Sequence, residues 1–149
     1  MSIRTRLNEV EKDIVKQRLM AKKSYLEDPE YTDGDLKGVL DTIPITLNTF
    51  QELSKDLANY PDLDIHNDLL LAVGLAEEVG EVLSHVKKIT RNDNGAITEV
   101  RRVKMLAEFS DVLFYFSRLS QHYGFTLEEI ANANQIKLLG RTKNGKPKG

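Results

Sequence analysis

Two short acidic pairs are the residues of this chain best placed to do chemistry. Glu78 and Glu81 are three residues apart, as are Glu108 and Asp111, and both pairs lie within apolar stretches. Residues three apart share one face of an α-helix, so two such helices side by side would bring four carboxylates together. Hard cations bind to oxygen-rich cages of this kind. The spacing therefore predicts a Mg²⁺ site, which Mn²⁺ could also occupy.

Ordinary ion pairs are the alternative explanation for these acids. The available partners are the basic residues that follow or precede the pairs: Lys87, Lys88, Arg101 and Arg102. An unpaired buried charge is costly, and acids that crowd one point raise one another's pKa. A bound cation would relieve both effects, so we favour the metal site.

Two glycines lie in the same stretch as the first acidic pair. Each of Gly74 and Gly80 costs a helix ~1 kcal/mol relative to alanine. The cost points either to close packing or ligand access at these positions, or to a helix whose packing tolerates glycine.

A basic group near the end of the chain could neutralise a polyphosphate held by the metal. Lys137 and Arg141 are four residues apart and share one helix face, with the amide of Asn134 one turn earlier. Lys146 lies further on, where it is either another phosphate contact or part of a solvated tail.

Composition limits the classes of function. The chain has 149 residues, no cysteine and a formal net charge of -2, which excludes disulfides and thiolate chemistry and argues against a nucleic-acid coat. Its longest apolar run, residues 69–73, is far below the ~20 residues that cross a bilayer. We expect a cytoplasmic protein that binds neither nucleic acid nor membrane.

Helical spacing of apolar residues predicts the elements that position these groups. Helices are expected from Thr46 to about residue 60, over residues 67–89, over residues 97–119 and over residues 127–140. Thr126 and Glu129 read as a capping box for the last one, and Gly124 should end the helix before it. The predicted fold is all-α, with an N-terminal helix and linker over residues 1–45, a compact domain over 46–141 and a basic flexible tail over 142–149.

Three blocks of the sequence resemble the MazG-like nucleoside triphosphate pyrophosphohydrolases of the all-α NTP pyrophosphatase superfamily. They are residues 74–82, residues 108–113 and the Asn134-x-x-Lys137-Leu138-x-x-Arg141 motif. The resemblance spans roughly residues 46–146. It implies a four-helix MazG-like bundle that assembles as a homodimer or homotetramer, and residues 1–45, which lie outside the resemblance, would form an additional arm. It also implies that Glu78, Glu81, Glu108 and Asp111 bind Mg²⁺.

The implied activity is hydrolysis of a nucleoside or deoxynucleoside triphosphate to the monophosphate and pyrophosphate, as nucleotide-pool housecleaning. Glu77, or one of the metal ligands Glu78 and Glu81, could accept the proton of the attacking water. His66 and Gln51 occupy places where related enzymes contact base or sugar. A surface residue at the helix entry is the alternative for His66, and an ordinary exposed position is the alternative for Gln51.

Two other functions remain open at this level. One is removal of pyrophosphate from the alarmone (p)ppGpp, which uses the same chemistry. The other is a helical module that binds a nucleotide or a protein partner without turnover. The intact acidic pairs, together with Lys137 and Arg141, argue against the second.

Overall fold

The computed structural model describes residues 45–58 and 67–143, and these residues are almost entirely helical. The helices are α4 (Leu47–Leu57), α5 (Asn67–Asn92), α6 (Glu99–His122) and α7 (Leu127–Lys143). The described ranges contain no strand, so the all-α prediction is confirmed. The predicted N-terminal helix and arm, as well as His66 and Lys146, lie outside the described residues.

Polar side chains fix where two of these helices begin. The Thr46 hydroxyl accepts a hydrogen bond from the backbone N–H of Thr49 at 3.1 Å. At α7, the Glu129 N–H donates to the Thr126 hydroxyl at 3.1 Å, and the Thr126 N–H donates back to the Glu129 carboxylate at 2.9 Å. This reciprocal pair satisfies backbone donors that the first turn leaves free. The predicted capping box is confirmed.

A tight turn joins α5 to α6. Asn94 and Gly95 both adopt positive φ angles, of 51° and 81°, which a left-handed turn requires and which glycine adopts without strain. The Arg101 side chain donates to the Asp93 carboxylate at 2.6 Å and closes the turn from the α6 side. The turn lies between the helices predicted over residues 67–89 and 97–119, although α5 extends to Asn92 and α6 begins at Glu99, two residues later than expected.

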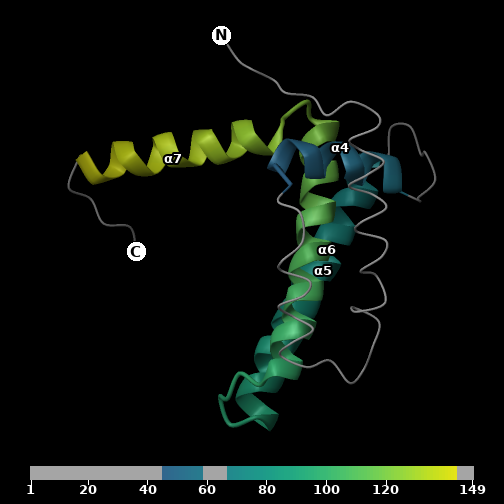
Figure 1. Cartoon of the computed structure of the whole chain (residues 1–149), viewed down its shortest axis with the longest axis vertical. Helices are drawn as coiled ribbons and strands as arrows, with labels where there is room; N and C mark the ends of the chain where they lie inside the picture. Colours follow the sequence, from purple (N-terminus) through teal and green to yellow (C-terminus); the bar gives the residue numbers. More distant parts are fainter. Residues whose placement is uncertain (1–44, 59–66, 144–149) are drawn as a thin grey trace.

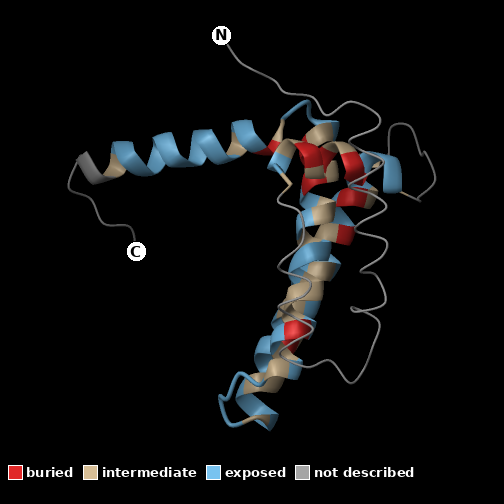
Figure 2. Cartoon of the chain, viewed as in Figure 1, coloured by how far each residue is buried: buried red, intermediate tan, exposed pale blue. Residues whose placement is uncertain are grey.

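The helices form a long hairpin with two attachments at one end (Figure 1). The antiparallel helices α5 and α6 lie side by side along their lengths, α4 crosses the hairpin near the start of α5, and α7 leads away from it. Buried residues gather mainly where α4 crosses the hairpin (Figure 2). The buried apolar side chains of the described residues are those of Leu53, Leu71, Val103 and Leu127. Leu53, Leu71 and Leu127 lie at the end where α4 and the root of α7 meet the hairpin, whereas Val103 lies near the start of α6, at the other end.

Much of the hairpin surface is apolar and exposed. The apolar run of residues 69–73 predicts first turns of α5 that are buried all round, and this prediction is wrong. Leu71 is 2% exposed, but Leu69 and Val73 are 62% and 57% exposed. In a two-helix hairpin, α6 covers only one face of α5, so the opposite apolar face stays open. None of the described helices is both long enough and apolar enough to cross a membrane.

Candidate metal centre

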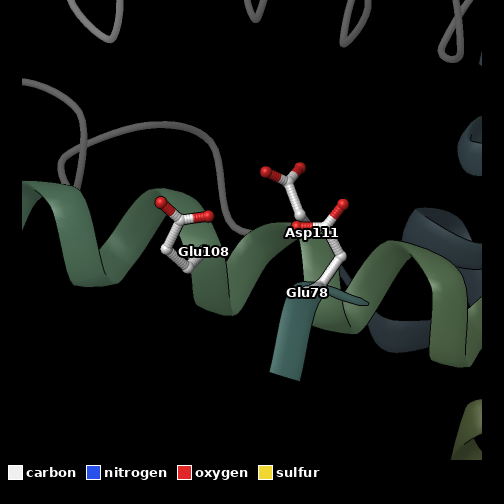
Figure 3. Close-up of side chains that lie close together, drawn as sticks. All are labelled: Glu78, Glu108 and Asp111. Atoms are coloured by element: carbon white, nitrogen blue, oxygen red, sulfur yellow. The ribbon is translucent and has the colours of Figure 1, made fainter. Parts of the chain in front are cut away.

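Three of the four predicted metal ligands converge at the middle of the hairpin. Glu78 comes from α5, and Glu108 and Asp111 come from α6; each offers a carboxylate oxygen, and these oxygens all lie within 4.8 Å of one another. Figure 3 shows Glu108 and Asp111 on the same side of α6, with the Glu78 carboxylate beside that of Asp111. Three convergent carboxylates form the kind of oxygen donor set that Mg²⁺ or Mn²⁺ binds.

Sequence spacing explains why α5 brings Glu78 to this place. Leu71, Gly74 and His85 are buried on α5, and with Glu78 and Glu81 they follow a spacing of three and four residues that marks one helix face. At Gly74 the ring of Tyr115 from α6 occupies the space of a side chain, since a Cβ built there would lie 2.3 Å from Tyr115 Cε1. Close packing therefore explains Gly74.

Gly80 has a different environment. Nothing lies within 4 Å of a Cβ built at this residue, which is exposed between Glu78 and Glu81. Packing against the described residues therefore does not account for Gly80.

In this cluster, each ionised carboxylate makes ionisation of its neighbours less favourable. Lost hydration raises the pKa of Glu78, and the neighbouring charges of Asp111 and Glu108 raise it further. Lost hydration also raises the pKa of Asp111, with Glu108 adding to the effect. Like charges at short range and partial burial both favour the neutral carboxylic acid. A bound divalent cation would instead favour the ionised carboxylates.

Salt bridges to nearby lysines and arginines were the alternative to a metal site, and the described residues do not form them. Arg101 pairs with Asp93, and Arg102 pairs with Glu99 at 3.6 Å. Within residues 45–58 and 67–143, no lysine or arginine pairs with Glu78, Glu108 or Asp111. The residues present thus fit a divalent cation better than a set of salt bridges.

His85 is a member of the site that sequence reasoning did not single out. Its Nε2 lies 3.3 Å from Glu108 Oε1, and its side chain is only 7% exposed. His85 is seven residues after Glu78 and four after Glu81, so the spacing places it on the same helix face. That spacing was the available signal.

Comparison with known families decides what this hairpin is. Residues 66–145, more than half of the chain, match the model of the MazG nucleotide pyrophosphohydrolase domain. The chain belongs to the MazG family. The match spans the whole of α5, α6 and α7, so it includes the acidic cluster and the basic residues of α7.

The chain is also similar to a curated phage protein. The Gene 37 protein of Mycobacterium phage L5 is 33% identical over 103 residues, which cover 66% of this MazG protein and 90% of the phage protein. No solved structure matches the chain.

Glu77 and Glu81 lie beside the cluster rather than in it. Both side chains are exposed, and neither belongs to the group of converging oxygens. Glu81 nevertheless shares the α6-facing stripe with Glu78 and His85, whereas Glu77 is rotated by ~100° from Glu78 around the helix. A change of side-chain rotamer would therefore bring Glu81 to the cluster more readily than Glu77.

The basic residues of the MazG motif lie on a separate arm. Asn134 and Lys137 are exposed and Arg141 is half-buried on α7, which leads away from the hairpin that carries the acids (Figure 1). Among the helices described, α7 packs mainly on α4, close to its own first turn. The structure does not bring these three residues to the acidic cluster of the same chain.

Gln51 is buried, which contradicts the alternative that it is an ordinary exposed residue. It is 4% exposed, and its amide bonds to the backbone of Ser117, Phe125 and Leu127. A contact between Gln51 and a nucleotide would require the release of at least one of these bonds. Its predicted contact with base or sugar therefore has no support from this geometry.

Proposed function

We propose that this MazG protein hydrolyses nucleoside or deoxynucleoside triphosphates to the monophosphate and pyrophosphate in the presence of Mg²⁺. The observation that carries the proposal is the convergence of Glu78, Glu108 and Asp111 at the centre of the hairpin. Membership of the family supports the reaction class. A triphosphate is a substrate class that uses both a bound cation and separate basic counter-charges.

Four side chains would hold the metal in this proposal. Glu78, Glu108 and Asp111 already converge, and Glu81 joins them by a rotamer change along the same stripe. When bound, Mg²⁺ neutralises charge on the phosphate oxygens and lowers the pKa of the attacking water. Glu81 is also better placed than Glu77 to accept the proton of that water, because it shares a helix face with Glu78.

A second copy of the chain would cover the exposed apolar face of the hairpin. On α5 the exposed residues repeat at a spacing of four and three, and α6 carries a similar exposed set. They are Leu69, Val73, Ala76, Gly80 and Leu83 on α5, and Phe109, Leu113 and Phe116 on α6. This is the spacing of helices that pair along their length, so two hairpins would form a four-helix bundle. The proposed assembly is a homodimer or a tetramer of such dimers.

The same assembly would give Lys137 and Arg141 a function. Lys137 lies ten residues after Leu127, so it stands ~15 Å along α7 from the root of that helix. Because α7 leads away from its own hairpin, the arm is positioned to reach another copy (Figure 1). We place Lys137, Arg141 and Asn134 at the phosphates of a nucleotide held by the acidic cluster of a second subunit.

Product analysis with the full-length protein tests the reaction. Each common NTP and dNTP, and separately (p)ppGpp, is incubated with Mg²⁺ and then with a chelator, and nucleotides, pyrophosphate and orthophosphate are quantified. The expected products are monophosphate and pyrophosphate in equal amounts, formed only with metal and absent with Glu108→Gln. Orthophosphate without pyrophosphate would overturn the proposed reaction. Turnover of (p)ppGpp alone would favour the alarmone, and no turnover of any nucleotide would favour the binding module.

A further inference from the structure

His85 occupies an unusual position for a histidine in an apolar helix pair. It is buried between α5 and α6, and Glu108 is the polar partner of its ring among the described residues, at 3.3 Å from Nε2. Its other ring nitrogen, Nδ1, is buried and has no hydrogen-bond partner in the part of the chain that the structure describes. An apolar side chain of similar size would fill this space without leaving a polar atom unsatisfied. Packing alone therefore does not account for a histidine here.

The contact with Glu108 indicates that Nε2 of His85 carries a hydrogen. A carboxylate only accepts hydrogen bonds, so the contact with Glu108 is favourable when Nε2 carries hydrogen. Nδ1 is then the unpartnered acceptor. The ring donates to Oε1 of Glu108 and leaves the second carboxylate oxygen free for another partner.

We infer that His85 is a positioning residue that holds the Glu108 carboxylate in the orientation needed to bind the cation. The inference rests on the proposed function, because it assumes that Glu108 is a metal ligand. Groups that hydrogen-bond to metal ligands fix the direction of the ligand's lone pairs, and their loss typically lowers metal affinity by ~10- to 100-fold. The His85 side chain is 7% exposed and that of Glu108 is 20% exposed, so little water competes for this hydrogen bond.

Three substitutions separate this role from simple packing. In His85→Gln the side-chain amide nitrogen can reach the position of Nε2 and still donate to Glu108. In His85→Asn the amide is too short to reach it, and in His85→Leu the donor is absent. Mn²⁺ serves as the probe, because its bound and free forms are distinguished by electron paramagnetic resonance without any turnover.

The expected result is a loss of Mn²⁺ affinity of ~10- to 100-fold in His85→Leu and His85→Asn, with His85→Gln within a few-fold of the natural protein. In a Glu108→Gln background, His85→Leu should cause no further loss, since its effect passes through Glu108. Circular dichroism confirms that each variant is folded, and if His85→Leu does not fold, His85→Asn and His85→Gln form the comparison.

Two outcomes separate a failure of the positioning role of His85 from a failure of the metal site. If the natural protein binds Mn²⁺ and all His85 variants bind it equally well, the positioning role is wrong and the metal site stands. If the natural protein does not bind Mn²⁺, the metal site itself fails. An additional loss from His85→Leu in the Glu108→Gln background would also overturn the positioning role, because the effect would then not depend on Glu108.

Discussion

The side-chain carbonyl of Gln51 accepts a hydrogen bond from the backbone N–H of Leu127 at 3.1 Å, which joins α4 to the first residue of α7. The amide nitrogen of Gln51 donates to the backbone carbonyls of Phe125 at 3.0 Å and Ser117 at 3.3 Å. One buried side chain thus connects α4, the end of α6 and the root of α7. The direction in which α7 leaves the hairpin depends on this connection.

Gln51→Leu should lower the free energy of unfolding by about 2 kcal/mol or more, because it leaves the Leu127 N–H and the Phe125 carbonyl without a partner. Urea unfolding followed by circular dichroism measures the change. Lys55→Arg on the exposed side of the same helix is the matched control and should stay within about 0.5 kcal/mol of the natural protein. If Gln51→Leu leaves the free energy of unfolding unchanged, the three hydrogen bonds of Gln51 do not hold α7.

The two glycines of α5 should respond in opposite directions to alanine. Gly74→Ala places a Cβ 2.3 Å from Tyr115 Cε1, so the ring must move, at an expected cost of about 1–3 kcal/mol in unfolding free energy. Gly80→Ala meets nothing within 4 Å and should stabilise the helix by up to about 1 kcal/mol. Thermal unfolding of both variants measures the difference.

Tyr115→Ala provides the control for Gly74→Ala. In the double variant the added methyl group no longer meets a ring, so Gly74→Ala should cost much less when Tyr115 is absent than when it is present. Equal costs in the two backgrounds would show that the ring is not the source of the strain.

Glu81→Gln should reduce kcat by about 100-fold or more while leaving the helical fold intact, because Glu81 completes the carboxylate set and is the proposed proton acceptor. Glu77→Gln is the matched control one helix position from Glu78, and it should retain most of the activity. Steady-state kinetics with the best triphosphate and circular dichroism provide the two readouts. Full activity of Glu81→Gln would remove this residue from the site.

The stability of the metal-free protein should decrease as pH rises through the range in which the cluster ionises. The pKa values of Glu78 and Asp111 are raised in the folded protein, so the folded state binds protons more tightly than the unfolded state there. Their stabilising contribution is complete below the unfolded carboxyl pKa of ~4 and is lost as pH rises through the raised folded values.

Mg²⁺ should oppose this loss, because it binds the deprotonated cluster. The increase in Tm on adding Mg²⁺ should therefore be larger at about pH 7.5 than at about pH 5. Differential scanning calorimetry with chelator and with Mg²⁺ measures both effects. Glu78→Gln combined with Asp111→Asn should remove the pH dependence that comes from the cluster, and a Mg²⁺ effect that persists in this variant would place the cation elsewhere.

Lys137→Ala should weaken triphosphate binding or slow turnover, and it offers a test of sites shared between subunits. Lys137→Ala protein is mixed with Glu108→Gln protein under conditions that exchange subunits. The mixture should show about a quarter of the natural activity, because half of the dimers are mixed and each mixed dimer has one intact site of two. Each variant alone, incubated in the same way, is the control. If subunits exchange but activity does not recover, Lys137 acts at the cluster of its own chain or is an ordinary solvated surface residue.

Local sequence patterns were sufficient for the helices and for the acidic pairs. The capping box at Thr126, the turn at Gly95 and the spacing of Glu108 and Asp111 are each settled within a few residues, where backbone geometry and hydrogen bonding act directly. All-α architecture follows from the same short-range information, because the apolar residues repeat with the period of a helix.

Tertiary structure decided everything that depends on distant segments. The partnership of His85 with Glu108 spans 23 residues, and that of Gln51 with Leu127 spans 76, so neither is visible in a local pattern. The open apolar face of α5 was missed for the same reason, since burial depends on which faces the neighbouring helices cover.

The sequence by itself determined that this chain forms amphipathic helices with two acidic pairs, because helix period and side-chain chemistry are properties of neighbouring residues. Only the tertiary structure decided that three of those acids converge, that His85 lies behind one of them, and that α7 directs Lys137 and Arg141 away from them. The physical reason is that these relationships arise from how helices pack against one another, and packing is set by the whole chain at once.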